Sequence, residues 1–293
     1  MKRGKRDSGN VAALVPEMPR RAAVQLMLVG YLAQARQMAE AWEVHPDDER
    51  LHQFRIALRR CRMLLRVFNV DVRDHGGDDL RKALTKVADR LGAVRDTDVI
   101  IQLIRESRYN RSGRNETEVG RILKMTCDIR EMNLAKVRRM GTGREWSKTI
   151  VFTERFIRRL MTDKSDPADR TIHAFLDREY AKYQKRMAGM THVARTDDGV
   201  MLHELRVRLR RFRYLGDMLS ALADKEQSRI FKRVRSCEKV LGQIHDIDVA
   251  LEFFVRHMNQ TPLLLKRELM ESRREKLARF REKWAKYRRK SEK

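Results

Sequence analysis

A histidine and a series of arginines fall on one face of the helix that the sequence predicts over residues 47–70. With about 100° of rotation per residue, this face spans an arc of about 80°. A second predicted helix, over residues 199–223, carries the same pattern. Arginine suits phosphate groups, because its planar guanidinium donates in a fork that matches two phosphate oxygens. The two faces therefore have the chemistry to bind a phosphate-rich anion. The first basic face consists of His52, Arg55, Arg59, Arg62 and Arg66, and the second basic face of His203, Arg206, Arg210 and Arg213.

The unmixed charge of these faces is unusual for a helix surface. Glu and Lys at i,i+4 stabilise a helix, whereas like charges at that spacing destabilise it. Two ordinary interpretations stay open: a solvated basic stripe, or arginines paired with acids of neighbouring helices. A histidine among arginines is expected to be neutral when the face is empty and able to take up a proton once phosphate charge arrives. Beside each basic face runs an apolar stripe, made of Phe54, Leu58, Cys61, Leu65 and Phe68 in the first helix and of Leu205, Leu209 and Phe212 in the second.

A second motif, Leu-Gly-x-x-x-Asp-x-Asp-Val, occurs at residues 91–99 and 241–249. Paired aspartates could serve metal-assisted phosphate hydrolysis, but two carboxylates per motif are few ligands, and we expect neither a metal ion nor another cofactor. We favour a structural role, in which a glycine breaks the helix, the first aspartate caps the restarting helix and the second is favoured by its dipole. The aspartates could also hold arginines in orientation. The expected structural residues are Gly92, Asp96, Asp98, Gly242, Asp246 and Asp248.

Both motifs belong to an internal repeat. Residues 51–62 recur at 202–213, an offset of 202 − 51 = 151, and residues 91–99 recur at 241–249, an offset of 241 − 91 = 150. Two blocks in the same order at nearly one offset indicate a duplicated unit. Each half then contains four helices. The predicted organisation is a basic disordered tail at 1–18, a first repeat at 19–143, a connecting helix and linker at 144–167, and a second repeat at 168–293.

The hydrophobic period is helical throughout, and no stretch alternates as a strand would. The sequence therefore predicts an all-α fold. The segment from Tyr109 to Asn115 is polar and is predicted to be a loop. The expected helices cover 19–43, 47–70, 77–108, 116–140, 144–163, 168–188, 199–223, 225–258 and 262–290, with breaks near Gly92 and Gly242.

The charge balance indicates a polyanionic partner. Lys and Arg number 66 against 41 Asp and Glu, which gives a formal net charge of +25. Such a surplus repels itself in a compact protein unless a nucleic acid, a phosphate polymer or an anionic membrane lies nearby. Aromatic residues make up only 6%, which disfavours single-stranded nucleic acid, since its binders usually offer aromatic stacking platforms.

The three cysteines, Cys61, Cys127 and Cys237, form no CxxC pair and are expected to be small core residues. The apolar stretch Ala22 to Ala35 is interrupted by Gln25 and Gln34 and is interpreted as a first helix and not as a targeting segment. No run approaches the roughly 20 apolar residues that span a bilayer. We therefore expect a reduced, cytoplasmic protein without membrane contact.

At residues 52–62 and 91–99, and at their partners 203–213 and 241–249, the sequence resembles the CHAD family, named for its conserved histidine and α-helical fold. The resemblance extends over about residues 19–290. It implies two four-helix bundles related by a pseudo-twofold axis, with a basic central groove or pore. It also implies binding of inorganic polyphosphate and association with polyphosphate granules. One departure is that His245 stands where the first repeat has Arg95.

Carried over to this chain, the resemblance places the histidine and arginine of each basic face along the pore, with help from lysines of the next helix. The expected polyphosphate-binding residues are His52, Arg55, Arg59, Arg60, Arg62, Arg66, Lys82, Lys86, His203, Arg206, Arg210, Arg211, Arg213, Lys232 and Lys239. Some family members carry a fused triphosphate-hydrolysing domain with a Glu-x-Glu-x-Lys strand, a motif that this sequence lacks. We therefore expect a binding protein and not an enzyme. A duplex nucleic-acid binder and a phosphohydrolase are the alternatives.

Overall fold

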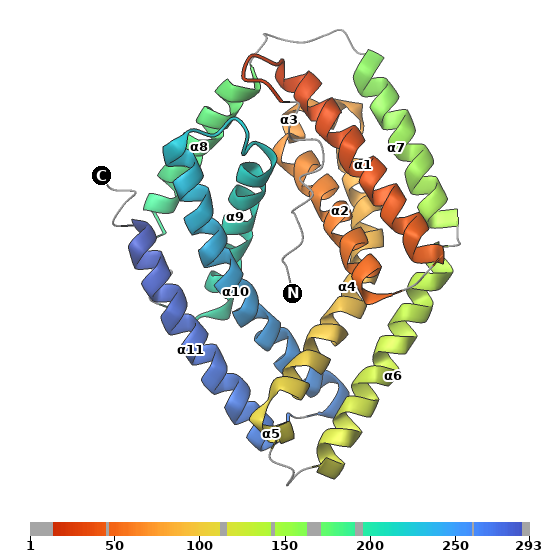
Figure 1. The fold of residues 1–293 in the computed structure, drawn as a ribbon, viewed down its shortest axis with the longest axis vertical. Coiled ribbons are helices and arrows are strands. Elements are labelled where there is room, and N and C mark those ends of the chain that lie inside the picture. Colours follow the sequence, from red (N-terminus) through yellow and green to blue (C-terminus); the bar gives the residue numbers. More distant parts are fainter. Residues whose placement is uncertain are drawn as a thin grey trace, which may run out of the picture. The chain divides into compact units, whose positions relative to one another are not determined.

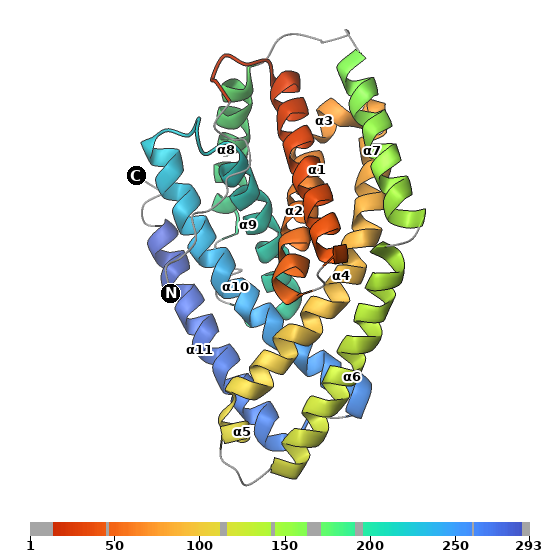
Figure 2. The same cartoon turned by 45° about the vertical axis from the view of Figure 1, so that its right-hand side comes forward.

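A computed structural model describes residues 14–44, 47–111, 116–141, 144–162, 171–190, 196–259 and 261–288. In these segments the chain is helical, and the one β-type contact is an isolated bridge between Pro19 and Thr171. Figures 1 and 2 show the helices in two views. The predicted all-α class is confirmed.

The helices follow the predicted ranges closely. Their bounds are α1 (Arg20–Val44), α2 (Asp48–Val67), α3 (Asn69–Val72), the 3-10 turn η2 (Arg73–His75), α4 (Gly77–Glu106), α5 (Arg108–Arg111), α6 (Glu116–Gly141), α7 (Arg144–Thr162), α8 (Ile172–Ala188), α9 (Gly199–Met218), α10 (Lys225–Met258) and α11 (Leu263–Arg288). Two differences are local. Helix α9 ends at Met218, before the predicted 223, and the predicted loop at 109–115 begins with the short helix α5. Residues 112–115 lie outside the described chain.

The predicted helix breaks at Gly92 and Gly242 are wrong. Helices α4 and α10 run through both glycines without interruption. A glycine inside a helix costs about 1 kcal/mol relative to alanine, and burial of the apolar side chains around it offsets that cost. Leu91, Val94, Leu241 and Ile244 are all at most 2% exposed. Because the helices do not restart, the capping role predicted for Asp96 and Asp246 is wrong too, as is the first-turn placement of Asp98 and Asp248.

By its contacts, the chain divides into two compact units. Unit 1 comprises Met1–Asp89, Arg138–Tyr183 and Tyr214–Arg229, and unit 2 comprises Arg90–Val137, Gln184–Arg213 and Ile230–Lys293. Each unit therefore combines segments from both sequence repeats. The repeat boundaries at 19–143, 144–167 and 168–293 stay a prediction, because a division by contacts does not test a duplication.

In unit 1, the apolar stripe predicted for α2 is buried, with Phe54, Leu58, Cys61, Leu65 and Phe68 at most 4% exposed. Phe68 stacks on Phe175 of α8, with ring centroids 4.5 Å apart, and Phe54 meets the ring of Trp146 of α7 edge-on at 5.1 Å. Leu14 is also buried, and the backbone N–H of Ile172 donates to the carbonyl of Met18 at 2.9 Å. The chain is thus packed before residue 19, whereas residues 1–13 of the predicted tail lie outside the described residues.

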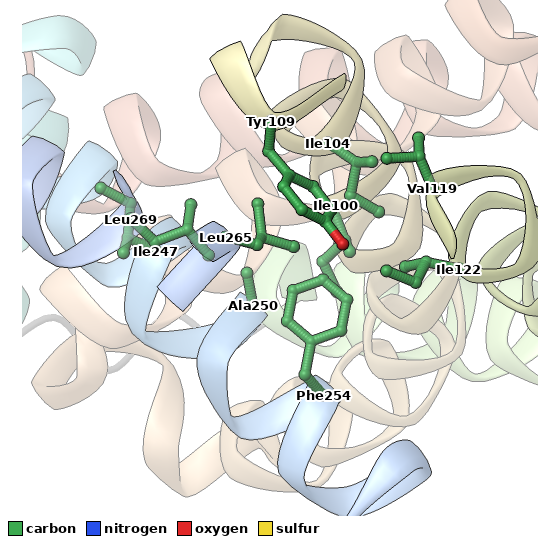
Figure 3. Close-up of a cluster of buried hydrophobic side chains, with 10 residues drawn as sticks. All are labelled: Ile100, Ile104, Tyr109, Val119, Ile122, Ile247, Ala250, Phe254, Leu265 and Leu269. Atoms are coloured by element: carbon green, nitrogen blue, oxygen red, sulfur yellow. The ribbon is translucent and has the colours of Figure 1, made fainter. Parts of the chain in front are cut away.

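In unit 2, the second half of α4 and the second half of α10 share a buried apolar cluster with α5, α6 and α11 (Figure 3). Such burial is the main source of helix stability in proteins, and it fixes the part of α4 and α10 that carries the aspartate motifs. The cluster consists of Ile100, Ile104, Tyr109, Val119, Ile122, Ile247, Ala250, Phe254, Leu265 and Leu269.

Two of the three cysteines occupy the core, as predicted. Cys61 and Cys237 are buried, and burial raises the pKa of each thiol to about 12. Cys127 is only half-buried, so the prediction of a core position is wrong for this residue. Among the described helices, none is long and apolar enough to cross a membrane.

Candidate anion-binding faces

The first basic face lies on the side of α2 that the apolar stripe leaves open. His52 and Arg66 are exposed, and Arg55, Arg59 and Arg62 are half-buried. Half-burial suits an anion site, because a guanidinium that is partly screened from water keeps more of its attraction for a ligand. The helical period therefore separates the two sides of α2 as predicted.

Arg60 points away from this face and packs against α1. Its Nη1 donates to Oε1 of Gln34 at 3.0 Å, and its guanidinium lies 5.9 Å from the ring centroid of Tyr31. These contacts place Arg60 between two helices of unit 1. Its equivalent in the second repeat, Arg211, is half-buried on α9.

The four predicted lysines are all exposed on α4 and α10. Lys82 forms an ion pair with Asp79 at 3.2 Å, in which both side chains are 69% exposed. An exposed pair of this kind contributes little to stability, so a ligand could displace Asp79 at small cost. Lys86, Lys232 and Lys239 are exposed to solvent, as Lys82 is.

The second basic face, on α9, has a carboxylate partner on α10. Nε of Arg210 lies 3.4 Å from Oε1 of Glu238, and Nε of Arg213 lies 3.5 Å from Oε2 of the same residue. The Glu238 side chain is only 13% exposed. The pairing of arginines with an acid of a neighbouring helix, left open as an interpretation of the sequence, is thus realised here. Sequence reasoning missed Glu238, because the equivalent position of the first repeat is Ala88.

His245 of α10 faces His203 of α9, with ring centroids 5.6 Å apart and planes inclined by 48°. Burial is the largest influence on its imidazole, and Arg206, His203 and Arg210 add positive potential. Together they lower the pKa of His245 to about 4, against about 6.5 for an unperturbed histidine. The ring is therefore neutral at pH 7. The substitution of histidine for arginine between the repeats was the sequence signal for this residue.

The first aspartates of the two aspartate motifs lie near the second basic face. Burial raises the pKa of Asp246 on α10, and Asp96 of α4 raises it further. Arg206, Arg95 and Arg210 act in the opposite direction. Arg95, like His245, was not among the predicted binding residues, although it belongs to the motif that was singled out.

The second aspartate of each motif binds an arginine of the following helix. Oδ1 of Asp98 on α4 accepts from Nε of Arg130 on α6 at 2.6 Å, and Oδ1 of Asp248 on α10 accepts from Nε of Arg273 on α11 at 2.7 Å. The four side chains are between 14% and 33% exposed. The arginines that these aspartates hold therefore lie on α6 and α11, and not on the basic faces.

Within the described segments, no group of three or more His, Cys, Asp or Glu side chains is arranged to hold a metal ion.

A family model and two solved structures match this chain. The family model described as CHAD domain matches residues 27–255. The crystal structure of the CHAD domain from the plant Ricinus communis has a TM-score of 0.67 at 19% identity, over 92% of this chain and 89% of that chain. PptA from Streptomyces chartreusis has a TM-score of 0.67 at 15% identity, over 93% of this chain and 100% of that chain. At these identities the likeness concerns the fold alone. No curated protein matches the chain.

Proposed function

Because the chain belongs to the CHAD domain family, we propose that it binds inorganic polyphosphate through its two basic faces and does not hydrolyse it. The observation that carries the proposal is the repeated series of one histidine and three arginines on the non-core side of α2 and α9. Guanidinium groups match phosphate oxygens, and a linear phosphate polymer presents one such group after another. The polymer's lack of rings also fits a protein with few aromatic residues.

The net charge of +25 supports a polyanionic ligand as well. Association should therefore release counterions, as it does for nucleic acids. We expect the affinity to fall steeply and log-linearly as salt increases. A titration of labelled long-chain polyphosphate at several salt concentrations measures this slope, and an affinity that stays flat would contradict an electrostatic mode of binding.

The decisive experiment is a competition. Labelled long-chain polyphosphate is bound to the full chain at physiological salt and challenged with unlabelled polyphosphate, duplex DNA and duplex RNA at equal phosphate concentration. Polyphosphate should compete best. If a duplex displaces the label more effectively than polyphosphate does, the protein is a nucleic-acid binder and the proposal fails.

The proposal also states that the protein does not hydrolyse polyphosphate. Incubation with polyphosphate, with and without divalent metal ions, should release no orthophosphate above background. The matched variants are Asp96→Ala and Asp246→Ala, since these carboxylates lie beside the second basic face. Sustained release that disappears in either variant would identify a phosphohydrolase instead.

A location at polyphosphate granules follows from the proposed ligand. A fluorescent fusion of the chain should concentrate on granules in a polyphosphate-accumulating cell and spread evenly in a cell that makes none. An even distribution in both cells would contradict the proposed location.

A further inference from the structure

We infer that His245 is a further ligand-binding residue of the second basic face, and that it takes up a proton when the polyanion binds. The inference rests on the proposed function. It adds that polyphosphate binding at the second basic face depends on pH, and that His245 is the side chain responsible.

The geometry places His245 among the residues that would meet the ligand. Its ring lies 5.6 Å from that of His203, and it interacts electrostatically with Arg206 and Arg210 of the same face. The side chain is half-buried and so remains reachable from solvent.

The charged groups around His245 come from several helices. On α10 itself, Glu238 is paired with Arg210 and Arg213, and Asp246 is the next residue along the chain. From α11, Arg273 contacts α10 at Asp248, in an ion pair that offsets its charge. The groups that act on His245 directly are His203, Arg206 and Arg210 from α9. Glu238 pairs with Arg210, and Arg95 and Asp96 of α4 act on the neighbouring Asp246.

In the empty protein, burial and the arginines keep the ring neutral, with a pKa of about 4. A bound phosphate chain brings roughly one negative charge per phosphate, which offsets the repulsion from Arg206 and Arg210. An opposite charge within a few ångströms favours the charged form of histidine. Once protonated, the ring donates from both nitrogens, so it gains a hydrogen bond to phosphate.

The sign of the pH dependence follows from linkage. The bound state has the higher pKa for His245, and it therefore holds more protons than the free state between the free pKa of about 4 and the bound pKa. Within this range the affinity increases as the pH falls, by at most about tenfold per pH unit for one proton. Above the bound pKa, His245 makes no contribution to the pH dependence.

The first repeat provides the matched comparison. The position equivalent to His245 is Arg95, which carries a positive charge at every accessible pH. His245→Arg therefore copies the first repeat into the second and replaces a conditional cation with a permanent one. His245→Gln keeps a polar side chain but cannot become charged.

The test is isothermal titration calorimetry of the full chain with long-chain polyphosphate at about pH 6, in buffers of different ionisation enthalpy. The dependence of the observed heat on buffer enthalpy gives the number of protons taken up. We expect a net uptake of a fraction of one proton, most of which is lost in both His245→Arg and His245→Gln. We also expect His245→Arg to bind about three- to tenfold more tightly than the original chain at about pH 8, and to show a flatter pH profile.

His203→Gln and Asp246→Asn test the assignment of the proton uptake to His245, since these two side chains are its neighbours that can also bind a proton. Most of the uptake should persist in both. Uptake that is unchanged in His245→Gln, or that disappears only in Asp246→Asn or His203→Gln, overturns the assignment to His245. Binding with no proton uptake overturns the inference and leaves the proposed function intact, whereas absence of polyphosphate binding at any pH overturns the proposed function itself. Circular dichroism of each variant confirms that it is folded.

Discussion

The basic faces of α2 and α9 have the same order of histidine and arginines but different surroundings. Within the described residues, Arg59 of the first face forms no ion pair. Its equivalent Arg210 shares the carboxylate of Glu238 with Arg213, and His203 faces His245. The two basic helices therefore have the same series of side chains, while the residues of the helices that follow them differ. The neighbours decide how much positive charge each face offers and how firmly its guanidinium groups are held.

This difference has two opposing effects on ligand binding. The carboxylate of Glu238 reduces the positive potential of the second face, and it also reduces the conformational freedom that Arg210 and Arg213 lose on binding. Both effects depend on the same contacts of Glu238 with Arg210 and Arg213. Substitutions at equivalent positions separate them.

Charge reversal on each face should have the largest effect. Arg59→Glu and Arg210→Glu, made separately, should each weaken polyphosphate binding at least tenfold, because each removes a charge-assisted hydrogen bond of about 1.5–3 kcal/mol and adds repulsion. Fluorescence anisotropy with labelled polyphosphate measures the affinity. Arg279→Glu, at an exposed position of α11, is the control and should change it much less. If Arg210→Glu binds normally while Arg59→Glu does not bind, the second face contributes only structure.

The second aspartates of the two motifs form equivalent ion pairs, and their removal should have equal effects. Asp98→Asn and Asp248→Asn should each lower the free energy of unfolding by about 1–2 kcal/mol. Loss of one partner of a fully buried pair costs about 3–5 kcal/mol, and these side chains are partly exposed. Urea denaturation measures the change, with Asp128→Asn at an exposed position of α6 as the control. Clearly unequal losses at residues 98 and 248 would show that the two ion pairs are not equivalent.

Exchange of the acidic neighbour tests the origin of the difference between the faces. Glu238→Gln should strengthen polyphosphate binding about three- to tenfold, because it removes a negative charge that competes for Arg210 and Arg213. Ala88→Glu, at the equivalent position of the first repeat, should weaken binding by a similar factor. The same anisotropy assay applies. Weaker binding by Glu238→Gln would mean that the carboxylate acts mainly by holding the arginines in position.

The smallest effect concerns stability and pH in the absence of ligand. The folded-state pKa of His245, about 4, lies below the unfolded value of about 6.5. The unfolded chain therefore binds the proton first, and stability falls as the pH decreases from about 6.5 to 4. Solvent screening of a half-buried ring limits the loss to the order of 1 kcal/mol.

His245→Gln should remove this part of the pH dependence, measured as melting temperature at about pH 7, 5.5 and 4.5. Asp246 acts with the opposite sign, because its pKa is raised in the folded state and protonation then stabilises the fold. Asp246→Asn should therefore make the loss of stability on acidification steeper. An identical pH profile for His245→Gln and the original chain would contradict the proposed environment of the ring.

Helical periodicity predicted most of the fold, because apolar spacing reports directly which side of a helix is buried. It placed α2 and α9 correctly and separated Phe54 and Leu58 from Arg55 and Arg59. It failed at Gly92 and Gly242, where local preference favours a break and packing around α4 and α10 overrides it. It left Arg60 outside the basic face, and this side chain packs against Gln34 and Tyr31 of α1.

The sequence by itself determined the helical class, the buried stripes and the repeated order of histidine and arginine on two helices, because each of these depends on spacing along one helix. Only the tertiary structure decided that Glu238 neutralises part of the second face, that Asp98 and Asp248 hold Arg130 and Arg273, and that His245 is kept neutral beside His203. These features depend on which side chains of other helices come within a few ångströms, since burial and nearby charges together set the charge state of a side chain.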